Sequence, residues 1–123
     1  VVGKFGFPLR TSYSASKHAL HGFFESLRAE LSDSGINVTI VCPGRIKTSI
    51  SLNAITKDGT PHGRMDDGQA NGMPVESCVK KIIHAVRKKK KISYIGRKEV
   101  LMVYIRLFLP VLYYKIVNKV KAK

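Results

Sequence analysis

Apolar residues recur at helical spacing between Tyr13 and about Ser34. Positions three and four apart share one face of a helix, so the pattern predicts a long helix, which Gly35 would end in a left-handed cap. The residues before it, 1–12, are broken by glycine and proline and predict the end of a strand and a loop. The apolar positions of the predicted helix are Ala15, Ala19, Leu20, Phe23, Phe24, Leu27 and Leu31.

Residues 36–42 are nearly all apolar and rich in β-branched side chains, which is typical of a buried parallel strand. Pro43-Gly44 would end it. Helix, short loop, buried strand and Pro-Gly turn, in this order, are typical of a doubly wound sheet. Ligands of such sheets bind beyond the carboxyl ends of the strands. We therefore predict an α/β fold with a parallel sheet, and a candidate binding edge at Pro43-Gly44.

Between Ile50 and Met73 the chain is polar and punctuated by glycine. A loop of this length is more often a lid or substrate loop than a connector, and a disordered surface insertion is the alternative. Pro74 then opens a second helix, and residues 92–95 predict a short strand that ends at Gly96. The predicted inner face of the second helix holds Val75, Cys78, Val79, Ile82, Ile83 and Val86.

Residues 98–123 combine apolar runs with lysine and arginine. Arg106 and Pro110 interrupt the runs, so the segment falls short of the about twenty apolar residues that a spanning helix needs. Tyr113-Tyr114 and the closing lysines are typical of an interfacial anchor. We predict a basic and apolar C-terminal helix, or a kinked hairpin, that binds a membrane surface. A helix packed on the domain or on a second subunit is the alternative.

The formal net charge of +14 lies almost entirely in the second part of the chain. Residues 1–79 carry eight Lys and Arg against seven Asp and Glu, whereas residues 80–123 carry fourteen against one. This asymmetry indicates an anionic partner for the tail. Lys88–Lys91 closes a helix without interleaved aromatic residues, and no nucleic-acid reading motif is present. We therefore predict a lipid surface as the partner, and no nucleic acid.

The two cysteines and four histidines show no metal-ligand spacing, and we predict no metal site. Cys42 and Cys78 lie in apolar runs, which predicts buried reduced thiols, with a disulfide as the alternative. A chain of 123 residues forms at most one domain.

Tyr13 and Lys17 stand four residues apart and share one face of the predicted first helix. A cation beside a phenol stabilises the phenolate, so the pair is suited to proton transfer. Tyr94 and Lys98 repeat this spacing, but Gly96 lies between them and the preceding strand pattern argues against a shared helix face. Tyr13 and Lys17 are therefore the candidate acid–base pair.

Two ordered motifs resemble a known family. Tyr13-Ser14-Ala15-Ser16-Lys17, with Gly3 ten residues before the tyrosine, is followed after the strand by Pro43-Gly44-Arg45-Ile46-Lys47-Thr48. Together they resemble the C-terminal half of a short-chain dehydrogenase/reductase, in the membrane-associated member 7 branch near the hydroxysteroid dehydrogenases. The resemblance covers residues 1–97 and implies the C-terminal part of a Rossmann-type sheet, with residues 98–123 as a separate tail.

The resemblance assigns roles residue by residue. Tyr13 would be the general acid/base, and Lys17 would support it and bind the nicotinamide ribose. The Pro43-Gly44 turn would pass the nicotinamide ring, while the Ile46 backbone and the Thr48 hydroxyl would hold the carboxamide. Thr48 as a helix cap is the alternative. The implied cofactor is NADP or NAD, with NADP favoured, and the implied substrate is a lipophilic alcohol or carbonyl such as a steroid, retinoid or lipid.

Parts of the family pattern fall outside the chain. The catalytic serine would precede Val1 by one position, and the glycine-rich phosphate loop would lie farther upstream. We expect a fragment of an oxidoreductase, inactive and marginally stable alone. The helix Tyr13–Leu31 implies a homodimer, and Lys119 with Lys121 resembles a retrieval signal of endoplasmic-reticulum membranes. A catalytically inactive interaction or dimerisation fragment is the alternative function.

Overall fold

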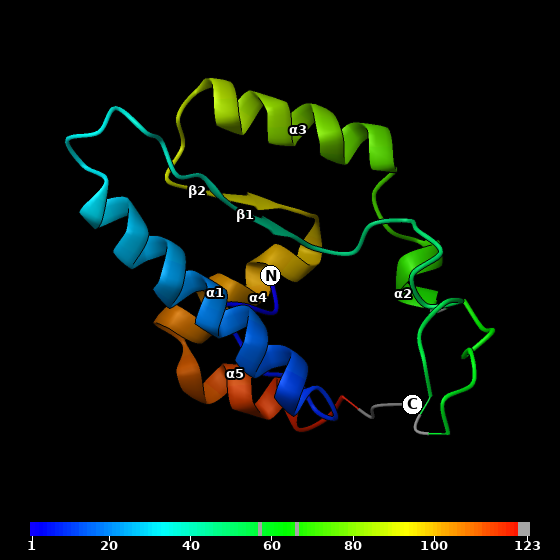
Figure 1. The fold of residues 1–123 in the computed structure, drawn as a ribbon. Coiled ribbons are helices and arrows are strands. Elements are labelled where there is room, and N and C mark those ends of the chain that lie inside the picture. Colours follow the sequence, from blue (N-terminus) through cyan, green and yellow to red (C-terminus); the bar gives the residue numbers. More distant parts are fainter. Residues whose placement is uncertain (57, 66, 121–123) are drawn as a thin grey trace.

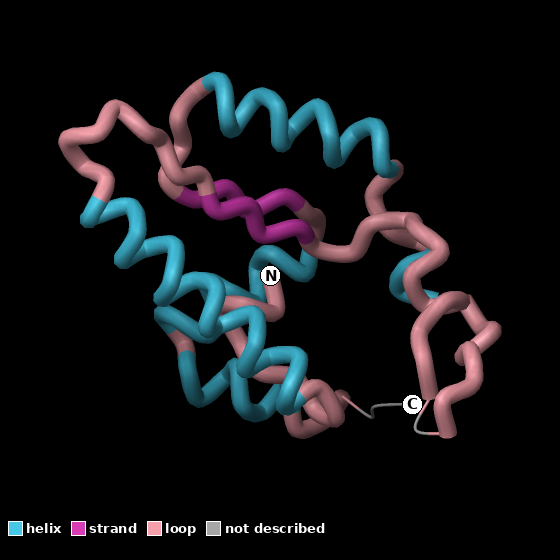
Figure 2. The backbone as a smooth tube through the Cα atoms, viewed as in Figure 1, coloured by secondary structure: helices cyan, strands magenta, loops and turns pink. Residues whose placement is uncertain are grey.

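A computed structural model describes residues 1–56, 58–65 and 67–120. The two strands pair in parallel, with Ile40 opposite Ile92 and Pro43 opposite Ile95. In Figures 1 and 2, α1 lies on one side of the strands and α3 on the other. The predicted α/β class with a parallel sheet is confirmed. In chain order the elements are α1 (Thr11–Glu30), β1 (Ile40–Pro43), α2 (Asp67–Ala70), α3 (Val75–Arg87), β2 (Ile92–Ile95), α4 (Lys98–Phe108) and α5 (Pro110–Val117).

The first helix differs from its predicted bounds at both ends. α1 begins at Thr11 and ends at Glu30, and a turn follows over residues 31–35. In that turn the Ser34 hydroxyl donates to the Leu31 carbonyl at 2.7 Å, and such local bonds compete with helix continuation. Gly35 is left-handed as expected, with φ +75°. It lies in the turn, however, and not at the helix cap.

β1 is shorter than the predicted strand over residues 36–42. Pairing begins only at Ile40, where β2 runs alongside, and Ile36 is 59% exposed. A central parallel strand is buried by neighbours on both edges. Among the described residues β1 has β2 as its one strand partner, and within β1 only Cys42 is buried. The early part of the predicted strand is therefore unpaired.

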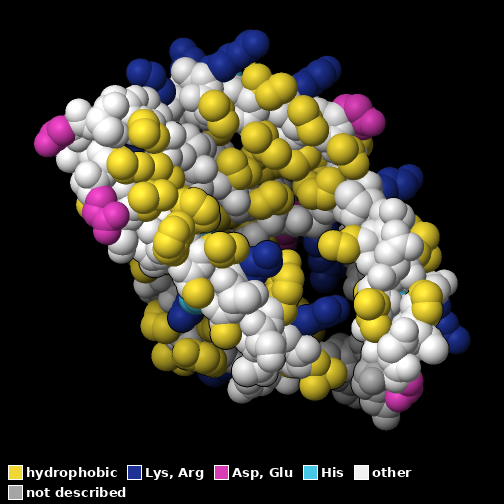
Figure 3. Space-filling model, viewed as in Figure 1, with side chains coloured by type: hydrophobic (Ala, Val, Ile, Leu, Met, Phe, Trp, Pro, Cys, Tyr) yellow, Lys and Arg dark blue, Asp and Glu magenta, His cyan; other side chains and the backbone are white. Residues whose placement is uncertain are grey.

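α3 follows Pro74 as predicted, but its expected inner face is only partly covered. Cys78 is buried and Ile82 is half-buried. Figure 3 shows hydrophobic side chains gathered along α3 and toward α1. Two strands are too narrow to cover this face, and large exposed apolar patches indicate missing partners. The exposed positions of the predicted inner face are Val75, Val79, Ile83 and Val86, at 42%, 44%, 45% and 55%.

The described residues form two small apolar clusters. The first joins α3 to β2 and consists of Met73, Cys78 and Ile95. The second joins the N-terminal segment to the two last helices and consists of Phe5, Val103, Tyr113 and Val117.

The tail of the chain packs on the N-terminal segment. The Tyr113 hydroxyl donates to the Gly6 carbonyl at 2.6 Å, and the Arg106 guanidinium donates to the Lys4 carbonyl. The described part of the tail is therefore anchored to the N-terminal segment.

The tail is helical, as predicted, and is divided into two helices, α4 and α5. The break lies at Leu109, with φ −134° and ψ 60°. Pro110 explains it, because proline lacks an amide N–H and disfavours helical geometry in the residue before it. In the described parts of the chain, no helix combines the length and the hydropathy needed to cross a bilayer.

The predicted loop over residues 50–73 has local structure. Ile55 and Pro61 form an isolated antiparallel bridge, and the His62 amide donates to the Ala54 carbonyl at 2.7 Å. Lys57 and Asp66 lie outside the described residues. The described part of the loop therefore forms a hairpin turn followed by α2, not a structureless insertion.

Candidate active site

Tyr13 and Lys17 lie in the first turns of α1, on one face as expected. The Lys17 ammonium lies over the Tyr13 ring, 5.4 Å from the ring centre. Tyr13 is 50% exposed, so solvent or a ligand can reach its hydroxyl. A cation over a phenol stabilises negative charge on the ring oxygen. The second Tyr–Lys pair is different, because Tyr94 belongs to β2 and Lys98 begins α4.

Ser14 and Ser16 follow Tyr13 in α1, and neither is a candidate nucleophile. The Ser16 hydroxyl donates to the Tyr13 carbonyl at 2.8 Å, inside the same helix. Ser14 is 7% exposed, and its hydroxyl has no hydrogen-bond partner among the described residues. In the described part of the chain, neither hydroxyl is hydrogen-bonded to a base that would activate it.

The turn after β1 is held by the backbone on both sides. The Gly44 amide donates to the Ile95 carbonyl at 2.7 Å, the Lys47 amide donates to the Met73 carbonyl at 2.9 Å, and the Met73 amide donates to the Arg45 carbonyl at 2.9 Å. Ile46 is thus bridged in parallel to Met73. In a parallel bridge the flanking residues make the bonds, so the Ile46 N–H and C=O point to the other side.

The Ile46 backbone therefore offers one donor and one acceptor at the carboxyl edge of the sheet. A carboxamide needs this combination, since it carries both an acceptor oxygen and a donor nitrogen. The Ile46 backbone thus fits the nicotinamide end of a dinucleotide. Thr48 is half-buried two residues later, and a bend and turn follow it, not a helix. Thr48 therefore does not serve as a helix cap.

Residues 1–3 connect the tyrosine helix with the turn after β1. The Val1 nitrogen donates to the Pro43 carbonyl at 2.6 Å. A Cβ at Gly3 would lie 2.8 Å from both the Lys17 carbonyl and the His21 ring, so only glycine permits this approach. Both halves of the candidate site therefore border the same short segment.

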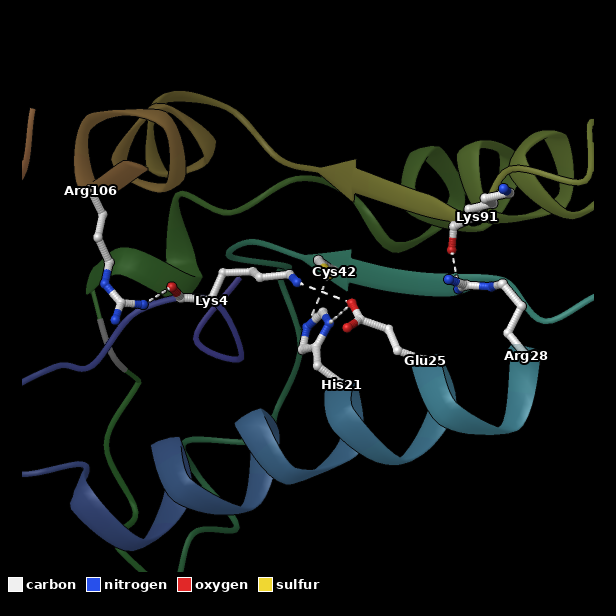
Figure 4. Close-up of polar contacts among 7 residues, drawn as sticks. All are labelled: Lys4, His21, Glu25, Arg28, Cys42, Lys91 and Arg106. Carbon is white, nitrogen blue, oxygen red and sulfur yellow. Dashed lines mark hydrogen bonds and ion pairs between the residues drawn. The ribbon is translucent and has the colours of Figure 1, made fainter. Parts of the chain in front are cut away.

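Lys4, His21, Glu25 and Cys42 form a polar cluster that the sequence analysis did not predict (Figure 4). The Cys42 thiol lies 3.6 Å from His21 Nε2. Glu25 Oε1 lies 4.0 Å from His21 Nδ1 and 3.6 Å from the Lys4 ammonium. One sequence pattern could have indicated this cluster, because Lys17, His21 and Glu25 are spaced four residues apart and share one face of α1.

At the centre of this cluster, burial favours the neutral forms of the Cys42 thiol and the His21 imidazole. Burial raises the pKa of the Cys42 thiol, although the positive charge of Lys4 opposes the shift. Burial, with Lys4, lowers the pKa of His21 against the opposing effect of Glu25. A neutral thiol beside a neutral imidazole packs as a structural pair, because a nucleophilic cysteine needs a lowered pKa. Both Cys42 and Cys78 are buried free thiols, as predicted.

An open groove lies at the same edge of the sheet, beside the turn after β1. Its volume is about 530 Å³, and its walls come from Arg45, the α2 segment through Met73, and the start of α4. A smaller groove of about 350 Å³ lies at the α4–α5 break and has an almost wholly apolar wall. Within the described ranges, no group of three histidine, cysteine, aspartate or glutamate residues could hold a metal ion.

The chain is similar to known dehydrogenases. A family model described as short chain dehydrogenase matches residues 1–58. Over 119 residues the chain is 44% identical to "Dehydrogenase/reductase SDR family member 7B" of Xenopus laevis, covering 96% of this chain and 37% of that protein. Over 124 residues it is 40% identical to "Dehydrogenase/reductase SDR family protein 7-like" of Drosophila melanogaster, covering 100% of this chain and 38% of that protein.

The likeness extends to mammals. The chain is 42% identical over 117 residues to the member 7B protein of Rattus norvegicus, covering 94% of this chain and 36% of that protein. The chain thus spans little more than a third of the length of the curated relatives that it matches. The chain belongs to the short-chain dehydrogenase/reductase family.

Proposed function

We propose that this chain is the part of a longer NAD(P)-dependent oxidoreductase that carries its acid–base tyrosine. The observation that supports the proposal most is the Lys17 ammonium over the half-exposed Tyr13 ring, 5.4 Å from its centre. This pair borders the same segment, residues 1–3, as the turn whose Ile46 backbone fits a carboxamide. The proposed cofactor is NADP in preference to NAD.

Each of the candidate site residues has a defined role in the proposed reaction. The cofactor supplies or accepts the hydride when it is bound. In the reducing direction the Tyr13 hydroxyl donates its proton to the substrate oxygen, and Lys17 stabilises the tyrosinate that this leaves. Solvent returns the proton, which the exposure of Tyr13 permits. The Ile46 backbone and the Thr48 hydroxyl orient the nicotinamide end.

We propose a lipophilic alcohol or carbonyl compound as the substrate. The segment between β1 and α3, proposed as the substrate loop, exposes apolar side chains that an apolar substrate would cover. Ile50, Ile55 and Met65 are 63%, 77% and 39% exposed. A soluble polar substrate would leave these side chains in water.

We also propose that the tail contacts a membrane surface, in the endoplasmic reticulum. Around the α4–α5 break, Leu107, Phe108 and Val111 are 69%, 71% and 69% exposed. Arg106 and Lys115 lie close by in sequence, and such a mixture suits an anionic lipid surface. Lys121, which contributes to the dilysine pattern, lies outside the described residues.

A homodimer through α1 is a further proposal. Leu20 and Phe23 on this helix are 45% and 62% exposed, and a second copy could cover them. The oligomeric state in solution, compared between the unsubstituted protein and Phe23→Ser, tests this contact.

The experiment for the proposed activity uses the complete polypeptide, meaning the natural protein that contains residues 1–123. It is incubated with NADPH or NADH and a panel of steroid, retinoid and fatty aldehydes or ketones, and cofactor oxidation is followed. We expect oxidation with at least one lipophilic carbonyl and a preference for NADPH. Binding of the cofactor without turnover of any substrate would instead support the catalytically inactive interaction protein.

A further inference from the structure

Glu99 occupies the carboxyl edge of the sheet, where both strands end. It is the second residue of α4, which begins three residues after β2. Its Oε1 accepts a hydrogen bond of 3.0 Å from the Arg45 amide, two residues after the end of β1. A single side chain thus connects the start of α4 to the turn after β1.

Two glycines make room for this carboxylate. A Cβ at Gly44 would lie 2.6 Å from Glu99 Cγ, and a Cβ at Gly96 would lie 2.8 Å from Glu99 Oε1. Real Cβ atoms do not approach this closely, so larger residues at either position would displace the side chain. The glycine of the Pro-Gly turn therefore has a contact that its own sequence motif does not reveal.

The surroundings keep Glu99 charged. It is the one acidic residue among fourteen Lys and Arg in residues 80–123. Burial raises the pKa of Glu99, but hydrogen bonding by the amides of Glu99, Arg45 and Arg97, with the Arg45 charge, outweighs burial and leaves the pKa below its ordinary value. Bonds from amides to a carboxylate are charge-assisted and stronger than neutral ones.

We propose that Glu99 is a positioning residue that fixes the turn from Pro43 to Ile46 for the nicotinamide half of the cofactor. This inference rests on the proposed function. The Gly44 and Arg45 amides are held in succession, one by the Ile95 carbonyl and the other by Glu99. Both bonds lie immediately before Ile46, whose backbone would hold the carboxamide. Without the carboxylate, the Arg45 amide loses its partner, and the bridge to Met73 is left to hold Ile46 without this support.

The test separates the two ends of the cofactor. In the complete polypeptide, dissociation constants are measured for NADPH and for 2′-phospho-ADP-ribose, which lacks the nicotinamide. Glu99→Ala removes a charge-assisted hydrogen bond and should weaken NADPH binding by about tenfold. Binding of 2′-phospho-ADP-ribose should not change. Glu99→Gln keeps an acceptor oxygen and should weaken NADPH binding by only about threefold.

Two controls keep the inference falsifiable. Glu76→Gln removes a carboxylate from the first turn of α3, where it is exposed, and should change neither constant. Thermal unfolding of every variant reports folding, and if Glu99→Ala does not fold, Glu99→Gln carries the test. Equal weakening of both ligands, or no change in either, would overturn the positioning role. If the unsubstituted protein binds neither ligand, the proposed function itself fails, and the inference fails with it.

Discussion

The ammonium of Lys17 lies over the ring of Tyr13, 5.4 Å from its centre, one helical turn away on the exposed face of α1. In the proposed reaction Lys17 is the group that stabilises the tyrosinate. In the complete polypeptide, Lys17→Met should lower kcat by about a hundredfold, the lower bound for loss of acid–base assistance. NADPH binding should weaken as well. Lys80→Met on the exposed surface of α3 is the matched control, and an unchanged kcat in Lys17→Met would remove Lys17 from the site.

Gly3 permits a backbone contact that a side chain would destroy. Gly3→Ala would place a Cβ 2.8 Å from the Lys17 carbonyl, and overpacking of this kind costs about 1–3 kcal/mol. The free energy of unfolding, measured in urea, should fall by that amount. Gly6→Ala is the control, because a Cβ there meets nothing within 4 Å. Equal stabilities of the two variants would show that the contact is not maintained in the complete protein.

His21 should make stability depend on pH in a defined direction. Burial lowers the pKa of His21 below its ordinary 6.5, so in this range the unfolded chain binds more protons than the folded one. The His21 contribution is therefore fully present above about pH 6.5. It is lost as the pH falls from there to the lower folded pKa.

Urea unfolding at a series of pH values tests this linkage. The stability curve of His21→Gln should be flatter than that of the unsubstituted protein below pH 6.5. His62→Gln, at an exposed position, should leave the slope unchanged. Parallel curves for the unsubstituted protein and His21→Gln would contradict the buried neutral imidazole.

The proposed membrane contact is tested better by point substitutions than by deletion of the tail. Deletion would remove Tyr113 and Val117, which pack on Phe5, and would damage the fold. The double variant Phe108→Ser with Val111→Ser alters only exposed side chains, at 71% and 69%.

Binding to vesicles that contain phosphatidylserine should weaken at least about tenfold in this double variant, because each large apolar side chain contributes about 1.5–3 kcal/mol on burial. Ile36→Ser, at an exposed position in the segment between α1 and β1, is the control. Vesicle binding equal to that of the unsubstituted protein would place the membrane contact elsewhere.

The features that the sequence predicted depend on near neighbours in the chain. The shared face of Tyr13 and Lys17, the left-handed Gly35 and the helix start after Pro74 follow from spacing and backbone preference alone. The full length of the strand before Pro43 could not be predicted, because strand pairing depends on a partner more than fifty residues away in sequence.

Contacts between distant residues explain the rest of what sequence reasoning missed. Cys42 and His21 are 21 residues apart, Arg45 and Glu99 are 54 apart, and Tyr113 and Gly6 are 107 apart. No local pattern marks such pairs. The incomplete burial of α3 has the same origin. The apolar spacing of a helix indicates which face packs against a sheet, but not how many strands cover that face.

The central claim, that Tyr13 is the acid–base group of an NAD(P)-dependent oxidoreductase, is tested most directly by Tyr13→Phe in the complete polypeptide. NADPH binding and single-turnover reduction of a lipophilic carbonyl are measured together. Tyr114→Phe is the control, because Tyr114 is at least as exposed as Tyr13, at 58% against 50%. We predict that Tyr13→Phe lowers the reduction rate by about a hundredfold or more while its dissociation constant for NADPH stays unchanged, and that Tyr114→Phe alters neither. Reduction by Tyr13→Phe at the unsubstituted rate would contradict the account.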